Sequence, residues 1–255
     1  GYLQQAVAVA DKFLDHDTIV STVERGGNNR EVKEARDQST DVAWPLAVLM
    51  SGNSASAAEI VAGALKNNER AVIIGERSFG KGSVQNLYPF SSGQGNESKL
   101  KLTVARYLTP GDYSIQNVGI PPDIALDRSV VYPPRLIKEL NEMSGPRVWL
   151  FFRDRMLREG DLAGHLVNEG DDSQPTLYRV RYLGPDPDAD AGPRTDRKDV
   201  TVDFEVTFAR DTLLGAQGAR RADILRDASA VVAARERSEN TRIEAELVLG
   251  ASQVR

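Results

Sequence analysis

The chain has 255 residues, of which 40% are hydrophobic and 27% are charged, as in ordinary globular proteins of one large or two small domains. Its formal net charge of −5 gives no electrostatic basis for nucleic-acid binding, and no apolar run is long enough to cross a membrane. The chain contains no cysteine, which excludes disulfides and thiol catalysis.

The first residues predict a helix followed by a strand. Apolar side chains recur with helical spacing from Leu3 to Leu14, and Thr18 to Arg25 is rich in β-branched residues, which favour a strand. A Gly-Gly-Asn-Asn turn signal follows at residues 26–29. The charged stretch 30–41 then predicts either a return strand or a loop.

The next stretch organises the rest of the chain. An apolar run at residues 45–50 predicts a strand, and it ends in a turn of small residues at 51–56. A helix pattern runs from Ala57 to about Asn67, followed by a second apolar run at 71–74 and a glycine-rich loop that contains Lys81. Strand, turn, helix and strand indicate α/β structure, in which chemistry lies where a strand ends and a helix begins.

Two residues of this stretch can form a reaction centre. Ser56 lies where the helix begins, and a serine hydroxyl needs a base to become a nucleophile. The chain has only two histidines, His16 and His165, and neither lies in a comparable sequence, so Lys81 is the candidate base. A lysine acts as a base only when neutral, and its ordinary pKa of about 10.4 must be lowered by burial. The backbone N–H of Ala57, unused by the helix, is available to an oxyanion.

Each candidate also has a structural interpretation. Ser56 and Glu59 fit a capping box, Lys81 fits a solvated surface charge, and Gln85 fits a solvent-facing strand residue. The pattern Gly-x-x-x-x-Gly-Lys that ends at Lys81 also begins like a phosphate-binding P-loop. However, Gly82 stands where a serine or threonine is required, and the following residues alternate as in a strand rather than a helix.

The remaining chain carries fewer signals. Strands are predicted at 83–90, 99–108 and 113–118, and a helix is predicted at 133–142. Val200 to Phe208 alternates strongly and predicts a strand, whereas Asp211 to Leu249 predicts a helix with a break near Gly215. Acidic residues between 171 and 190 lack the EF-hand ligand pattern, so the sequence predicts no metal site.

Two motifs carry a resemblance to a known family. The sequences SASAAEI at residues 54–60 and GERSFGKGSVQ at residues 75–85 resemble those of the carboxyl-terminal processing peptidases, or tail-specific proteases. The resemblance continues through residues 100–110 and ends with GIPPD at 119–123, so it covers about the first half of the chain.

This resemblance implies a serine endopeptidase with a Ser–Lys dyad that forms an acyl-enzyme. Ser56 corresponds to the nucleophile, Lys81 to the general base, and Gln85 to a glutamine that orients the lysine. Lys81 follows Ser56 by 25 residues, which fits the family. Gly1 corresponds to the last glycine of a turn that helps Ala57 to form the oxyanion hole. The rest of that turn and a peptide-binding PDZ domain are expected upstream, so we expect a fragment that can be inactive alone.

The resemblance also implies a fold and a biological setting. The implied fold is mixed α/β, of the crotonase-like or Clp-protease-like kind, with a catalytic core at 1–128 and a C-terminal α+β extension at 129–255. An exposed loop is predicted near 184–197. The implied partners are protein or peptide substrates with exposed C-terminal tails, without cofactor, metal or nucleic acid, in the bacterial periplasm or another space outside the cytoplasm. Substrate-binding residues are not assigned, and a homo-oligomer is compatible with the sequence.

Two alternatives from other classes stay open. One is a catalytically inert interaction module that keeps the protease fold, and the other is a nucleotide-binding protein built around the P-loop-like glycine loop. A shift of melting temperature with nucleotide would favour the second alternative. Failure of a serine-directed reagent to label a complete chain would favour the first.

Overall fold

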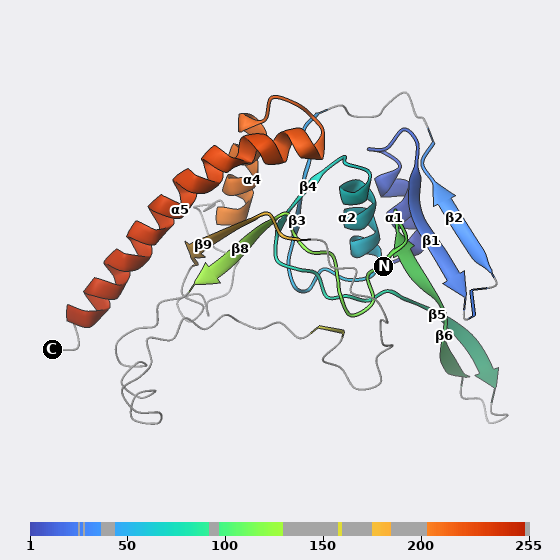
Figure 1. Cartoon of the computed structure of the whole chain (residues 1–255). Helices are drawn as coiled ribbons and strands as arrows, with labels where there is room; N and C mark the ends of the chain where they lie inside the picture. Colours follow the sequence, from blue (N-terminus) through green and yellow to red (C-terminus); the bar gives the residue numbers. More distant parts are fainter. Residues whose placement is uncertain are drawn as a thin grey trace, which may run out of the picture.

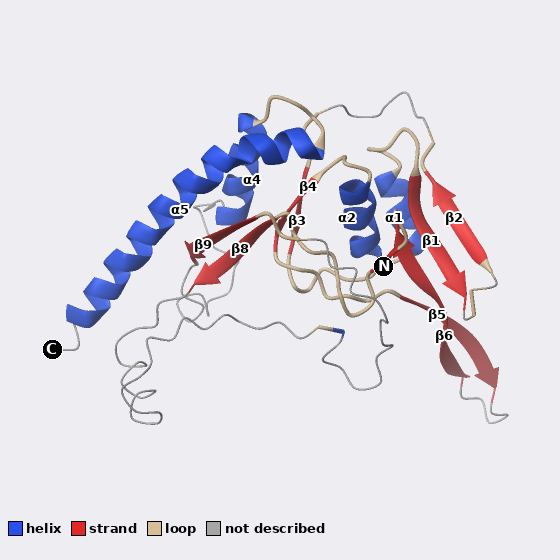
Figure 2. Cartoon of the chain, viewed as in Figure 1, coloured by secondary structure: helices blue, strands red, loops and turns tan. Residues whose placement is uncertain are grey.

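A computed structural model describes the fold for residues 1–24, 26–27, 29–36, 44–91, 97–129, 158–159, 175–184 and 203–252. Within these ranges the predicted mixed α/β class is confirmed, because helices pack against both an antiparallel and a parallel sheet (Figures 1 and 2). The predicted helix at 133–142 and most of the predicted loop at 184–197 lie outside the described residues.

The antiparallel sheet has the strand order β2–β1–β6–β5, with the short β7 also paired to β6. Its strands are β1 (Thr18–Glu24), β2 (Arg30–Glu34), β5 (Ser83–Ser91), β6 (Glu97–Thr109) and β7 (Tyr113–Ser114). The return strand considered for residues 30–41 therefore exists as β2. The strand predicted at 113–118 is shorter than expected, because the chain turns back after Ser114 and the Gly119 N–H donates to the Ile115 carbonyl oxygen.

The parallel sheet lies on the other side of the chain's first two helices, with the order β3–β4–β8–β9. Its strands are β3 (Ala47–Met50), β4 (Val72–Gly75), β8 (Ile124–Ser129) and β9 (Tyr178–Leu183). The first two match the apolar runs of the sequence, whereas β8 and β9 were not predicted. Parallel strands need long crossover connections, and here one connection is α2, as the strand–helix–strand pattern indicated.

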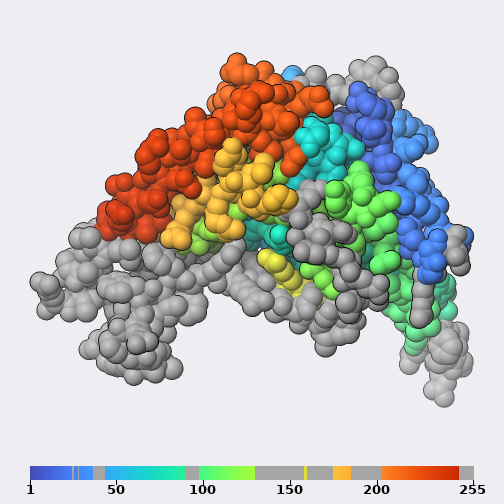
Figure 3. Space-filling view, viewed as in Figure 1, coloured from blue at the N-terminus to red at the C-terminus, as the bar shows by residue number. Residues whose placement is uncertain are grey.

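Four helices complete the described fold, and they form two layers. Helices α1 (Leu3–Ala10) and α2 (Ala57–Asn67) lie between the two sheets (Figure 1). Helices α4 (Phe204–Gly215) and α5 (Arg221–Ser252) cover the opposite face of the parallel sheet and form an outer surface of the molecule (Figure 3). Strand β4 shows this division directly, because Ile73 packs in the α1–α2 core while Val72 and Ile74 pack in the α4–α5 core.

The strand predicted at Val200 to Phe208 is wrong for the residues that the structure describes, since α4 begins at Phe204. Phe204 and Phe208 are four residues apart, and on a helix this spacing places both on one face. The ring of Phe204 stacks on Tyr182 of β9 with centroids 4.3 Å apart and lies 5.9 Å from the ring of Phe208, which is fully buried. Tertiary packing of this aromatic face therefore outweighs the local alternation. The predicted break near Gly215 is confirmed.

The predicted boundary after residue 128 falls within β8, and β9 from the C-terminal half extends the same parallel sheet. The division into two domains stays a prediction. Within the described ranges, no helix combines the length and the apolar character that a membrane crossing requires.

A buried ion cluster fastens α5 to the core. The Asp123 carboxylate is fully buried and lies 3.2 Å from Lys66 Nζ and 2.7 Å from Arg221 Nη2. Arg221 also contacts Glu69 at 2.5 Å, so one guanidinium joins α5 to the loop after α2 and to the start of β8. Burial lowers the pKa of Lys66, and the attraction of Asp123 opposes this shift. Removal of any one of these charged side chains would leave a buried partner without one of its counter-charges.

Replacing Arg221 by Met should lower the free energy of unfolding by about 3 kcal/mol, because a buried carboxylate loses a hydrogen-bonded counter-charge. Arg226→Met is the matched control, since Arg226 lies on the same helix and also contacts two carboxylates, but its side chain is exposed. That control substitution should lower the free energy of unfolding by less than about 1 kcal/mol. Urea unfolding of both variants measures the difference, and equal losses would contradict the anchoring role of Arg221.

Candidate active site

The turn between β3 and α2 holds Ser56 in an unusual backbone conformation. Ser56 has φ 57° and ψ −116°, a region that side chains other than glycine rarely adopt. Such a residue costs about 1–3 kcal/mol and persists only where its surroundings enforce it. Strain of this kind is concentrated at functional sites, so the backbone conformation of Ser56 is compatible with the predicted nucleophile, although four other non-glycine residues of the described ranges also have positive φ.

The Glu59 carboxylate holds the Ser56 backbone in this conformation through hydrogen bonds. Its Oε2 accepts the backbone N–H of Ser56 at 2.7 Å and the backbone N–H of Lys81 at 2.9 Å. Its Oε1 accepts the Gly80 N–H at 2.7 Å and the Ser78 hydroxyl at 2.5 Å. One carboxylate oxygen therefore joins the backbones of the predicted nucleophile and the predicted base, which brings these two residues together in space.

Glu59 is fully buried, and its environment is built for a carboxylate. Burial raises the pKa of the Glu59 carboxyl, and the hydrogen bonds from Ser78, Gly80, Ser56 and Lys81 oppose this shift. A buried charge is tolerated when it is fully hydrogen-bonded, and bonds to an ionised acceptor are stronger than neutral ones. The capping-box interpretation of Glu59 is therefore correct for its bond to Ser56 but describes only one of its four bonds.

The loop after β4 braces the serine turn at two further points. Glu76 Oε2 accepts the Gly52 N–H at 2.9 Å, and the Phe79 N–H donates to the Ser54 carbonyl oxygen at 3.0 Å. Residues 51–56 are therefore held along their length by residues 76–81. This explains how a strained serine persists in a turn of small residues.

Lys81 lies half-buried in this loop, and none of the ion pairs between described residues includes it. The backbone N–H groups of residues 80–82 already donate hydrogen bonds within the protein. Those of Gly80 and Lys81 donate to Glu59, and that of Gly82 donates to Gln116 Oε1 at 3.0 Å. A P-loop offers such N–H groups to phosphate and continues into a helix. Here those groups are occupied and strand β5 follows, so the P-loop alternative is wrong.

Ala57 and Gly1 meet at the start of α2. A Cβ added to Gly1 would lie 2.6 Å from Ala57 Cβ, so the two residues are in direct contact and Gly1 has no room for a side chain. Ala57 is the first residue of α2, and the first N–H groups of a helix have no acceptor within it. The structure thus places Gly1 against Ala57, the residue that follows Ser56.

Gln85 is the predicted site residue that the structure does not connect to the others. It is exposed on β5, next to a register shift, and its Nε2 donates to Thr103 Oγ1 of β6 at 3.4 Å. Its role in orienting Lys81 stays a prediction.

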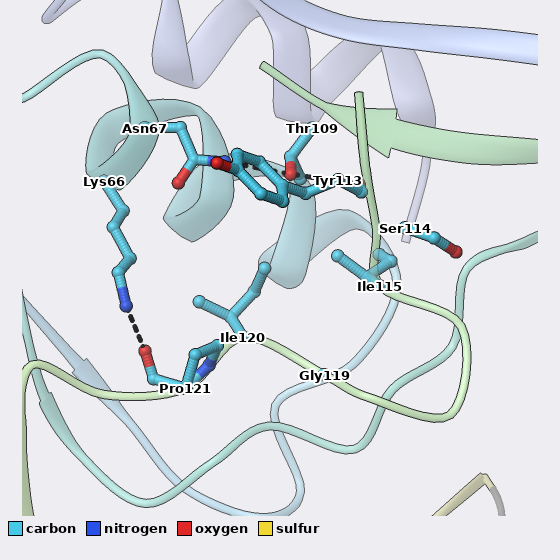
Figure 4. Close-up of a pocket in the computed structure, with 9 residues that line it drawn as sticks. All are labelled: Lys66, Asn67, Thr109, Tyr113, Ser114, Ile115, Gly119, Ile120 and Pro121. Carbon is cyan, nitrogen blue, oxygen red and sulfur yellow. Dashed lines mark hydrogen bonds between the residues drawn. The ribbon is translucent and has the colours of Figure 1, made fainter. Parts of the chain in front are cut away.

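A small open pocket lies beside Lys66 and Asn67, at the C-terminal end of α2 (Figure 4). Lys66, Asn67, Thr109, Tyr113 and Pro121 are among its lining residues, and no predicted site residue lines it. The Lys66 ammonium donates to the Pro121 carbonyl oxygen there. No cluster of three potential metal ligands occurs in the described part of the chain.

Sequence reasoning missed the residues that assemble the site. Glu59 was read only as a helix cap, while Ser78 and Gln116 were not singled out for any role. Ser78 donates to Glu59 and accepts the Ile120 N–H at 2.6 Å, which ties the loop to the segment before β8. An acidic residue within an apolar helix pattern is the sequence signal that could have indicated Glu59.

Comparisons with known proteins agree with the motifs. The sequence model described as Peptidase family S41 matches residues 1–126. The carboxy-terminal-processing protease of Bartonella bacilliformis is 47% identical over 128 residues, which cover 50% of this chain and 29% of that protein. The corresponding protease of Synechocystis sp. is 40% identical over 131 residues, covering 51% and 29%. Among solved structures, the photosystem II D1 C-terminal processing protease is 39% identical, with a TM-score of 0.46, and the match covers 50% of this chain and 32% of that one.

The chain therefore spans less than a third of the length of the curated relatives it matches. The resemblance predicted from the serine and lysine motifs is confirmed, and the matched part coincides with the first half of the chain.

Glu59→Gln should lower the free energy of unfolding by about 2–4 kcal/mol, because both carboxylate oxygens accept donors and the amide nitrogen must face at least one pair of them. Glu34→Gln, on the exposed edge strand β2, should change it by less than about 0.5 kcal/mol. Denaturant unfolding of the two variants tests this. Equal free energies of unfolding for the two variants would contradict the role of Glu59 in holding the Ser56 turn and the Lys81 loop together.

Proposed function

Residues 1–126 match the model of peptidase family S41, and from this premise we propose that the protein is a serine endopeptidase that uses a Ser56–Lys81 dyad. The observation that carries the proposal is the shared Glu59 oxygen, which fixes the backbones of both residues relative to one another. The strained conformation of Ser56 supports it, because nothing in a simple helix cap requires φ 57°.

The proposed reaction proceeds through an acyl-enzyme. Ser56 Oγ attacks the carbonyl carbon of the scissile peptide bond while neutral Lys81 Nζ takes the hydroxyl proton. The Ala57 N–H, with the backbone of Gly1 beside it, stabilises the oxyanion of the tetrahedral intermediate. Lys81 then gives its proton to the leaving amine, and the C–N bond breaks. A water molecule, deprotonated by Lys81, hydrolyses the ester and restores Ser56. Gln85 would orient the lysine from β5.

The substrates proposed are proteins cut near their C-terminal tails. This rests on the names of the relatives, which are carboxyl-terminal-processing proteases of bacteria and, in several cases, of chloroplasts. A place of action outside the cytoplasm, in the bacterial periplasm, is proposed from the family resemblance alone. Because the chain spans less than a third of those relatives, substrate binding and any oligomer can involve segments beyond these residues.

Cleavage of an unstructured protein should depend on both members of the dyad. Ser56→Ala should abolish it, and Lys81→Ala should lower the rate by about 100-fold or more. Lys81→Arg should not restore it, because arginine does not deprotonate at working pH. The assay compares these variants with Ser229→Ala and Lys99→Ala, two exposed positions that should leave the rate unchanged.

An active arginine variant would contradict the lysine-base mechanism. If the chain cleaves nothing, the assay is repeated with a longer protein, in which the N-terminal part of the Bartonella bacilliformis relative precedes Gly1. Inactivity of that longer protein, together with failure of a serine-directed reagent to label it, would establish the inert interaction module instead.

A further inference from the structure

The glycines on either side of Lys81 contact one turn, residues 115–119, which connects β7 to the segment before β8. We call it the Gln116 turn. Gln116 is almost completely buried, and its Oε1 accepts the Gly82 N–H at 3.0 Å. The next residue, Asn117, donates its backbone N–H to the Gly80 carbonyl oxygen at 2.8 Å. The turn therefore holds the peptide groups that precede and follow Lys81.

The contact between the two segments is too close for side chains. A Cβ on Gly82 would lie 2.8 Å from the Gln116 backbone nitrogen, and a Cβ on Gly80 would lie 3.1 Å from the Asn117 carbonyl carbon. Gly80 also has φ +96°, which strains other residues. The Gly-Lys-Gly sequence is therefore shaped to fit the Gln116 turn, and only the lysine projects a side chain.

An amide is suited to this position because it can accept and donate at once. While Oε1 accepts the Gly82 N–H, Nε2 donates to Asn117 Oδ1 at 2.9 Å, which fixes the orientation of the amide. On the other side of the loop, the Lys81 N–H is fixed by Glu59. The backbone on both sides of the Lys81 side chain is thus immobilised from two directions, by a carboxylate of α2 and an amide of the Gln116 turn.

We propose that Gln116 is a positioning residue for Lys81, acting through the Gly82 N–H to aim the lysine Nζ at Ser56. The proposal rests on the proposed function, in which Lys81 is the base. A flexible lysine side chain inherits its direction from the backbone at its Cα, and a displacement of about 1 Å at a catalytic group can cost about 100-fold in rate. The Gln116 turn therefore contributes to the rate without touching the substrate.

The test is a double-mutant cycle on acylation of the 255-residue chain by p-nitrophenyl acetate, whose good leaving group keeps slow variants measurable. Gln116→Met keeps the size of the side chain but removes its acceptor and its donor. It should lower the first-order rate constant of acylation at saturating ester by about 10- to 100-fold and change the ester concentration that gives half of this rate by less than about 2-fold. In a Lys81→Ala background the same substitution should change the rate by less than about 2-fold, because the residue through which it acts is gone.

Thr212→Val is the matched control for loss of a buried polar side chain. Thr212 is fully buried in α4, and its hydroxyl donates to the Phe208 carbonyl oxygen at 2.9 Å, so its removal disturbs the other core. It should lower the melting temperature to a similar extent while leaving acylation unchanged. Gln116→Glu, which keeps the acceptor oxygen, should recover part of the rate lost in Gln116→Met.

Three results would overturn the inference. Unchanged acylation in Gln116→Met, in a protein whose acylation requires Ser56 and Lys81, would refute it and leave the proposed function intact. An equal loss with and without Lys81 would show that Gln116 acts on the fold rather than on the base. Acylation that requires neither Ser56 nor Lys81 would refute the proposed function, and this inference with it.

Discussion

The arrangement of this site depends on one buried carboxylate, which joins two loops by hydrogen bonds. Glu59 lies in the first turn of α2, yet three of its four hydrogen bonds go to residues 78–81, in the loop after the next strand. Because the group is fully buried, these bonds are made in a low-dielectric environment, where each bond to a charge is strong and each missing bond is costly. The separation of the Ser56 turn and the Lys81 loop is therefore set by the size of a carboxylate group.

The layers around α2 explain why the site lies where it does. Strands β3 and β4 are parallel neighbours, so their carboxyl ends meet at one edge of the sheet, and α2 begins at that edge. The antiparallel sheet supplies the other wall, and β6 leads through β7 into the Gln116 turn. The C-terminal helices close the far face, and Arg221 joins α5 to Asp123, a residue of the family-matched part. Strand β9 and helices α4 and α5 thus complete the second core, on the face of the parallel sheet away from α2.

The sequence predicted what local patterns encode. The β3–α2–β4 unit and the lysine loop were recovered because their apolar periodicity and glycine spacing lie within about forty residues. The parallel pair β8 and β9 was missed because the two strands lie about fifty residues apart and charged residues interrupt the apolar pattern of each. Phe204 and Phe208 were placed in a strand because their alternation is local, whereas the contact with Tyr182 that favours the helix is not. The partners of Glu59 lie up to 22 residues away, so its role could not be read from spacing alone.

The most direct test of the account is a crystal structure of the chain after reaction with a fluorophosphonate, which forms a stable adduct with an activated serine. Phosphorus should be bonded to Ser56 Oγ, a phosphonyl oxygen should lie within hydrogen-bond distance of the Ala57 N–H, and Lys81 Nζ should lie within about 3.2 Å of Ser56 Oγ. The Glu59 carboxylate should still join the Ser56 and Lys81 N–H groups. An adduct on another serine, or a Lys81 ammonium directed into solvent with the Glu59 bonds intact, would contradict the claim that this carboxylate assembles a Ser–Lys active site.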